Sequence, residues 1–225
     1  METVELGIEE REIGAFDQVT LRDDSCGAEL VIEQGEREGI RIEARPQLLR
    51  RIETQVRDGR LIIRMSGSWL ERLGDKLSTS LTRSRTLYHL QARELRSLDI
   101  GCAAMVFAPS LRADTLAIKL AGATRVVIEN LVARELRIEH SGVGELEVDG
   151  RVVRQEVTLD GVGMYSAAEL RSQVSVVRIS GPARARVHAS EELDAVVRGI
   201  GVVEYSGSPR VRQRVLGMGS VVKVE

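Results

Sequence analysis

Aromatic side chains are scarce in this sequence, since Phe, Trp and Tyr together make up 3% of its 225 residues. Hydrophobic residues still account for 43%, which excludes a disordered chain. The core must therefore be built mainly from Val, Ile, Leu and Ala. A chain of this length forms one or two domains and can bury a sizeable core.

An excess of charge of one sign is also missing, because 32 basic and 34 acidic residues leave a net charge of −2. That balance gives no basic field for nucleic acid or anionic membranes, so we expect no nucleic-acid partner. No apolar run approaches the roughly 20 residues that span a bilayer, so no transmembrane segment is expected. The opening residues METVELGIEEREIG do not resemble a signal peptide, and a cytoplasmic location stays open.

Candidate metal ligands are few. The two cysteines, Cys26 and Cys102, lie far apart, and so do the three histidines, His89, His140 and His188. No two of them have the spacing of metal ligands. We therefore expect no metal site and no cofactor, and we interpret Cys102 as a small buried residue rather than a disulfide partner or a ligand.

What the sequence does contain is a repeat along its C-terminal two-thirds. Seven small residues recur at steps of 20, 20, 19, 20, 18 and 18: Cys102, Gly122, Gly142, Gly161, Gly181, Gly199 and Gly217. A second small residue follows each of them two places later: Ala104, Thr124, Gly144, Gly163, Ala183, Gly201 and Gly219. A small-x-small unit at a near-fixed period is typical of a solenoid.

Apolar residues alternate on both sides of this small-residue corner, at two and four places before it and four and six places after it. Such alternation predicts two strands per repeat, each with one inward face. A further apolar column at Leu111, Leu131, Val152 and Leu170 leaves room for a third strand. We predict an all-β fold, a right-handed parallel β-helix of about seven coils of 18–21 residues. The corner is small because a Cβ there would collide with the coil stacked beside it.

The N-terminal residues predict a cap for the solenoid. Alternating apolar residues flank the loop 34–39 and the dipeptide Asp58-Gly59, and both patterns predict β-hairpins. We expect 1–65 to form this cap and 87–225 the repeats, within one continuous domain over 13–225. For 66–86 a short amphipathic helix, with Trp69 at its start, and a loop are equally consistent with the pattern.

The repeats resemble those of the bacterial auto-transporter adhesin head family, also called the GIN domain, whose function is unknown. The resemblance covers roughly 13–225. It is carried by repeats similar to L-x-L-S-G-S-G-D-V at 138–146 (IEHSGVGEL) and 197–203 (VRGIGVV), by FDQVTL at 16–21, and by VEYSGSP at 203–209. It implies a β-helical fold, an adhesin-type role, and a cell-envelope or extracellular setting.

Motifs that would indicate catalysis are absent. The Gly-Val-Gly triplets at 142–144 and 161–163 precede strands rather than the helix that a phosphate-binding loop requires. The outward column three places before the corner mixes charges, and Lys119 is expected to pair with Glu139 on the next coil. We find neither a nucleophile motif nor a carboxylate cluster, and we expect no catalytic residues and no enzyme activity.

His140 stands in an inward column otherwise occupied by Leu, Ile and Val. We interpret it as a buried neutral imidazole with a hydrogen-bond partner, and the alternative is a ligand-binding or pH-sensitive residue.

These observations favour a non-enzymatic scaffold for interaction or adhesion, with a protein or glycan ligand or another copy of the chain as its partner. The alternative is an intracellular structural scaffold that stacks end to end through its last coil, as a homo-oligomer. A third interpretation is a carbohydrate-active β-helix enzyme that uses outward Lys119 and Arg178.

Overall fold

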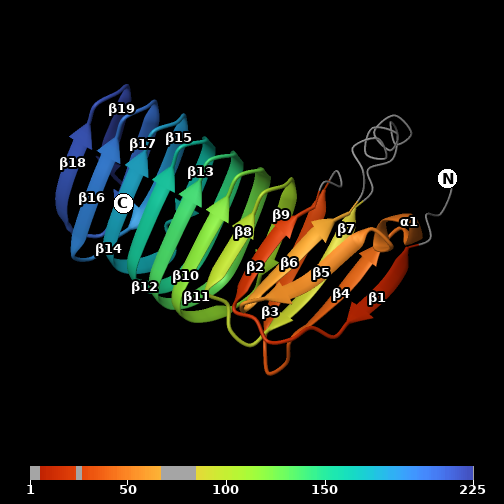
Figure 1. The fold of residues 1–225 in the computed structure, drawn as a ribbon. Coiled ribbons are helices and arrows are strands. Elements are labelled where there is room, and N and C mark those ends of the chain that lie inside the picture. The colour runs from red at the N-terminus through yellow and green to blue at the C-terminus, as the bar shows by residue number, and fades with distance from the viewer. Residues whose placement is uncertain (1–5, 24–26, 67–84, 225) are drawn as a thin grey trace.

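The computed structural model describes residues 6–23, 27–66 and 85–224, which fold almost entirely as β-strands (Figure 1). The helix α1 spans Pro46–Leu49, and no helix among the described residues has the length and apolarity needed to cross a bilayer. The strands are β1 (Gly7–Arg11), β2 (Gln18–Arg22), β3 (Ala28–Gln34), β4 (Gly39–Ala44), β5 (Ile52–Arg57), β6 (Arg60–Met65), β7 (Thr86–Ala92), β8 (Ser97–Ile100), β9 (Ala104–Ala108), β10 (Leu111–Leu120), β11 (Ala123–His140), β12 (Val143–Leu159), β13 (Val162–Ala167), β14 (Leu170–Ile179), β15 (Ala183–His188), β16 (Glu192–Val197), β17 (Gly201–Ser206), β18 (Arg210–Val215) and β19 (Gly219–Lys223).

Strands β8 to β19 form a β-solenoid of about six turns, which confirms the predicted fold class. Equivalent residues pair in parallel between neighbouring coils, so that Val126 lies between Val106 and Leu146. On the face before the corner, Ile138 lies between Ile118 and Val157 in the same way. Seven corner residues mark the limits of six complete turns, which accounts for the difference between the seven coils predicted and the six turns observed.

A third, shorter face separates the two long ones. There Leu131 pairs with Leu111 on one side and with Gly150 on the other, and Gly150 in turn pairs with Leu170. The chain bends into this face at a register shift between Ile128 and Leu131. In the later coils the segment between the long faces is two residues shorter, 188–191 in place of 168–173, which explains why the repeat falls from 20 to 18 residues.

The N-terminal strands give the solenoid a cap-like start. Strand β2 pairs in parallel with β8 and β6, and β3 pairs in parallel with β9 and β7, so both long faces continue into the cap. Antiparallel strands then end each face: β5 pairs with β6 on one, and on the other β4 pairs with β7 and β1 with β4. Because the pairing runs unbroken from cap to coils, we propose that 13–225 is one continuous domain.

Of the two predicted hairpins, one is confirmed and the other is wrong. Strands β5 and β6 form an antiparallel hairpin whose turn residues Asp58 and Gly59 have φ angles of 49° and 72°. Strands β3 and β4 do not pair, because β7 lies between them and contributes buried residues, Tyr88 among them, to the same inward face. The predicted loop or helix over 66–86 lies mostly outside the described residues.

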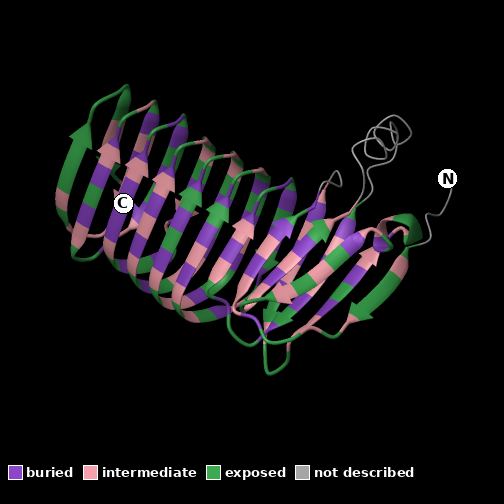
Figure 2. Cartoon of the chain, viewed as in Figure 1, coloured by how far each residue is buried: buried purple, intermediate pink, exposed green. Residues whose placement is uncertain are grey.

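The interior is a continuous apolar stack, and buried and exposed residues alternate along its strands (Figure 2). Aliphatic side chains dominate it, as the composition predicts, but the largest fully buried side chains are Tyr88 and Tyr165. Tyr88 donates a hydrogen bond of 2.6 Å to the buried Asp23 carboxylate. Burial, reinforced by the neighbouring Asp23, raises the pKa of Tyr88, which stays a neutral donor.

Candidate interaction surfaces

The corner glycines lie where successive coils touch backbone to backbone. A Cβ placed on Gly122 would overlap the carbonyl oxygen of Cys102, and one on Gly142 would overlap that of Gly122. The same overlap with the preceding coil occurs at the remaining members of the column: Gly161, Gly181, Gly199 and Gly217. Cys102 is buried, with its sulfur 3.9 Å from the Leu21 carbonyl oxygen, while Cys26 lies outside the described residues.

His140 lies inside the solenoid between Leu120 and Leu159 of the adjacent coils. His140 is 2% exposed, and its Nε2 has no hydrogen-bond partner among the described residues. The predicted hydrogen-bond partner is therefore wrong for this nitrogen. Burial lowers the pKa of His140, and the neutral imidazole is favoured in the fold. His140 faces no surface from which a ligand could reach it.

A second interior polar cluster surrounds Gln155. The Tyr165 hydroxyl donates to Gln155 Oε1 at 2.9 Å, and the Gln155 amide donates to Ser172 Oγ at 3.0 Å. Ser172 in turn donates to the His188 carbonyl oxygen at 2.5 Å. Because all three side chains are buried and mutually bonded, the cluster holds the third face in place and offers no binding surface.

The outward faces of the coils carry charges of both signs in pairs. Lys119 Nζ lies 2.9 Å from Glu139, as expected from the register, and Arg178 lies 2.6 Å from Glu156. Exposed pairs of this kind contribute about 0–1 kcal/mol each, so they solubilise the faces more than they stabilise them. At the bend into the third face, burial and the nearby Glu147, Glu169 and Glu129 raise the pKa of Asp149. Among the described residues no acidic group is arranged to hold a metal ion.

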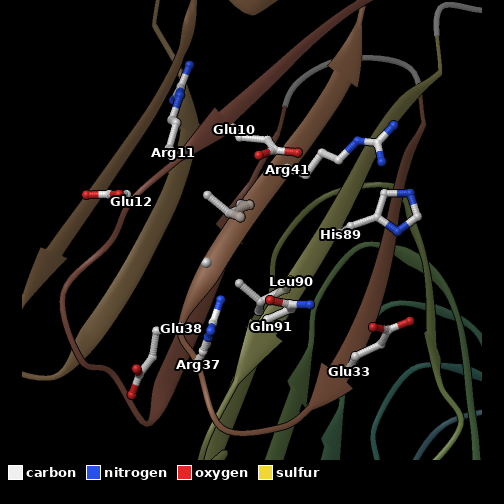
Figure 3. Close-up of a pocket in the computed structure, with 12 residues that line it drawn as sticks. Glu10, Arg11, Glu12, Glu33, Arg37, Glu38, Arg41, His89, Leu90 and Gln91 are labelled. Carbon is white, nitrogen blue, oxygen red and sulfur yellow. The ribbon is translucent and has the colours of Figure 1, made fainter.

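The cap carries a polar hollow of about 710 Å³, which we call the cap hollow (Figure 3). Strands β1, β3, β4 and β7 and the 35–38 loop surround it. Its lining residues are Glu10, Arg11, Glu12, Glu33, Arg37, Glu38, Gly39, Ile40, Arg41, His89, Leu90 and Gln91. The sequence reasoning did not single out this site, although the acidic and basic residues crowded into 9–12 and 36–38 were a signal for it.

Strand pairing orders the polar groups of the cap hollow. Glu10 lies opposite Arg41, which lies opposite His89, and Figure 3 shows this row of three side chains. Arg41 also forms an ion pair of 2.9 Å with Glu43. Arg11 is committed to the fold, because its guanidinium donates to the Ile52 carbonyl oxygen at 2.8 Å and so ties β1 to β5. Donors and acceptors therefore stand side by side around an open volume.

Comparison with known proteins agrees with this architecture. The family model described as "Putative auto-transporter adhesin, head GIN domain" matches residues 15–209, which include the corner glycines from Gly122 to Gly199. The chain belongs to this family. The resemblance drawn from the repeats is thereby confirmed. A search of curated proteins finds no match.

Solved structures of other proteins share the fold over nearly their whole length. A "putative adhesin" from Bacteroides fragilis is 20% identical, with a TM-score of 0.85, covering 99% of this chain and 98% of that one. A "putative lipid binding protein" from Parabacteroides distasonis is 18% identical with a TM-score of 0.67, covering 98% and 97%. A "putative adhesin" from Parabacteroides merdae is 18% identical with a TM-score of 0.64, also covering 98% and 97%. At these identities the likeness establishes the fold.

Proposed function

We propose that this GIN-domain chain is a non-enzymatic scaffold of adhesion type, acting in the cell envelope or outside the cell. The observation that carries the proposal is the cap hollow, an open polar volume on a molecule whose interior is occupied by side chains. Family membership and the adhesin descriptions of the similar structures support the general role.

The lining of the cap hollow favours a glycan over an apolar small molecule. Pockets for apolar ligands are lined mainly by hydrophobic and aromatic groups. Here the described lining offers carboxylates, guanidinium groups, an imidazole and the Gln91 amide, while the side chains of Ile40 and Leu90 are buried in the core. Such a set of donors and acceptors suits a ligand with many hydroxyl groups.

A carbohydrate-active enzyme is the less favoured function. The outward residues that it would use, Lys119 and Arg178, are each held in an ion pair with a carboxylate of a neighbouring coil. Glycoside hydrolysis usually needs two carboxyl groups facing each other across a substrate, one of them a proton donor. The outward charges are instead arranged as pairs of opposite sign, which supports a binding surface over a catalytic one.

A glycan array followed by titration of the retained glycans tests the proposal. We expect the double substitution Arg41→Ala and Gln91→Ala to weaken glycan binding about tenfold or more, a loss of roughly 1.4 kcal/mol. The matched control is Arg134→Ala, which removes an exposed ion pair with Asp114 away from the hollow and should bind as the wild type does. Binding to no glycan, or an equal loss in the control, would reject the cap hollow as the site.

End-to-end stacking is the second candidate, and one observation favours it. In the last coil the inward column is open: Val215 is 40% exposed, whereas Val197, its equivalent one coil earlier, is fully buried. The inward column there holds Val211, Gln213 and Val215, and the outer edges of β18 and β19 pair with no other described strand. Another copy could continue the stack on this surface.

A further inference from the structure

The position directly after the corner forms an apolar ridge along one edge of the solenoid. Its members are apolar in every copy, and all are exposed: Ala103, Ala123, Val143, Val162, Pro182, Ile200 and Met218. The turns that carry these residues follow one another along a single edge of the solenoid in Figure 1. The ridge grows bulkier toward the C-terminus, where Ile200 is 57% and Met218 74% exposed.

Charge along this edge is unequally distributed. In the coils of Gly142 and Gly161 the outward positions beside the ridge include Glu139, Glu145 and Asp160. In the last two coils the equivalent positions hold Arg198 and Arg214 and no acidic residue. Neither arginine forms an ion pair with a described residue. The overall net charge of −2 therefore conceals a locally basic edge.

These two trends meet at the corners of the last two coils. We define the C-terminal corner patch as Arg198, Ile200, Arg214, Leu216 and Met218. Leu216 adds a third large apolar side chain that is 58% exposed. All five residues are exposed. They lie at the corners where the chain passes from one long face of the solenoid to the other, and the outside of such a corner is convex. The patch lies at the end of the solenoid opposite the cap (Figure 1).

The chemistry of the patch matches one kind of surface. Protruding apolar side chains flanked by basic ones are typical of proteins that lie on membranes, where the apolar groups enter the headgroup region. Arginine binds phosphate with several donors and keeps its charge, which suits phospholipid headgroups. A convex row needs a matching groove on a folded protein partner, whereas a fluid bilayer adapts to it. The observations therefore favour a membrane over a protein.

We propose that the C-terminal corner patch binds the surface of an anionic bilayer, with Ile200, Leu216 and Met218 inserted among the headgroups and Arg198 and Arg214 on lipid phosphates. This inference is independent of ligand binding in the cap hollow, because the two sites lie at opposite ends of the molecule. It also replaces, for this edge, the expectation from net charge that the chain has no affinity for anionic membranes.

Sedimentation of the full chain with vesicles tests the proposal. We expect binding to vesicles of phosphatidylglycerol and phosphatidylcholine, with at least tenfold weaker binding to phosphatidylcholine alone. The double substitution Leu216→Ser and Met218→Ser should weaken binding to the anionic vesicles at least tenfold. Arg198→Gln with Arg214→Gln should remove the preference for anionic lipid, and so should raised salt, because it screens the charges.

The matched control is Val143→Ser with Val162→Ser, which changes the same ridge position in the acidic coils. It should sediment as the wild type does, and circular dichroism should show all variants folded, since each substituted side chain is exposed. Failure to bind anionic vesicles overturns the proposal, as does an equal loss in the control. Retention of an envelope protein by the patch without vesicle binding would assign the surface to a protein partner instead, and would also overturn it.

Discussion

His140 occupies an inward position whose neighbours on the adjacent coils are both leucine. Burial lowers its pKa below the ordinary value of about 6.5, so the unfolded chain takes up a proton more readily than the folded one. Stability therefore rises with pH through this range and is lost as the pH falls below about 6.5. In effect His140 makes the middle of the stack sensitive to mild acid.

We predict that His140→Leu stabilises the protein by about 1–3 kcal/mol at pH 7.5, because a buried nitrogen without a partner is removed. The gain should grow at pH 5.5, because the wild type also loses stability there as the unfolded chain takes up a proton on His140 more readily than the folded one. Denaturant unfolding at both pH values measures this. Ile138→Val, which changes a neighbouring buried position without a titratable group, is the control and should keep the wild-type pH dependence. A His140→Leu variant with the same pH dependence as the wild type would contradict the prediction.

At the scale of the element, the corner glycines determine how closely two coils can stack. A methyl group on Gly142 would overlap the Gly122 carbonyl oxygen, and backbone cannot rotate away as a side chain can. We predict that Gly142→Ala destabilises the protein by about 1–3 kcal/mol, the usual cost of overpacking, or more. Thermal unfolding measures the effect. Gly35→Ala is the matched control, since a Cβ there meets nothing within 4 Å, and its stability should stay close to that of the wild type.

The solenoid elements could be predicted from sequence because their pairing is local and repeats. Each corner glycine has its steric partner one coil away, so a single column in the alignment reports the contact. The hairpin at Asp58-Gly59 was equally local. Strand β7 could not be placed, because its partners β3 and β4 are both distant in sequence and a short polar loop between them suggested direct pairing.

The candidate surfaces were harder to predict than the fold. The cap hollow depends on β1 and β7 pairing with opposite edges of β4, and no repeat in the sequence encodes this topology. The ridge had a signal that was overlooked: the residue between the two small columns is apolar in all seven copies, from Ala103 to Met218. The alternation places this column at an outward position, and the structure shows that all seven residues are exposed.

At the scale of the whole molecule, the last coil determines whether copies assemble. Val215 shares an inward column with the buried Val197 and is partly exposed, and it borders an unpaired strand edge. We predict that, if copies stack, Val215→Asp abolishes the higher oligomers, because it places a charge in the apolar seam. Light scattering over a concentration series measures this. Val153→Asp, at an exposed position of β12, should leave assembly unchanged, and oligomers that survive Val215→Asp would reject end-to-end stacking.

The residue-for-residue pairing of neighbouring coils makes a whole coil the smallest segment that the chain can lose or gain without disturbing the rest. Removing 123–142 would join Gly122 to Val143, which pairs with Ala123 and so fills the equivalent place. The cap hollow and the C-terminal corner patch would then lie about 4.8 Å closer together, and neither would change. The distance between the two ends of this fold therefore changes in steps of one coil. Evolution can adjust that distance separately from what either end binds.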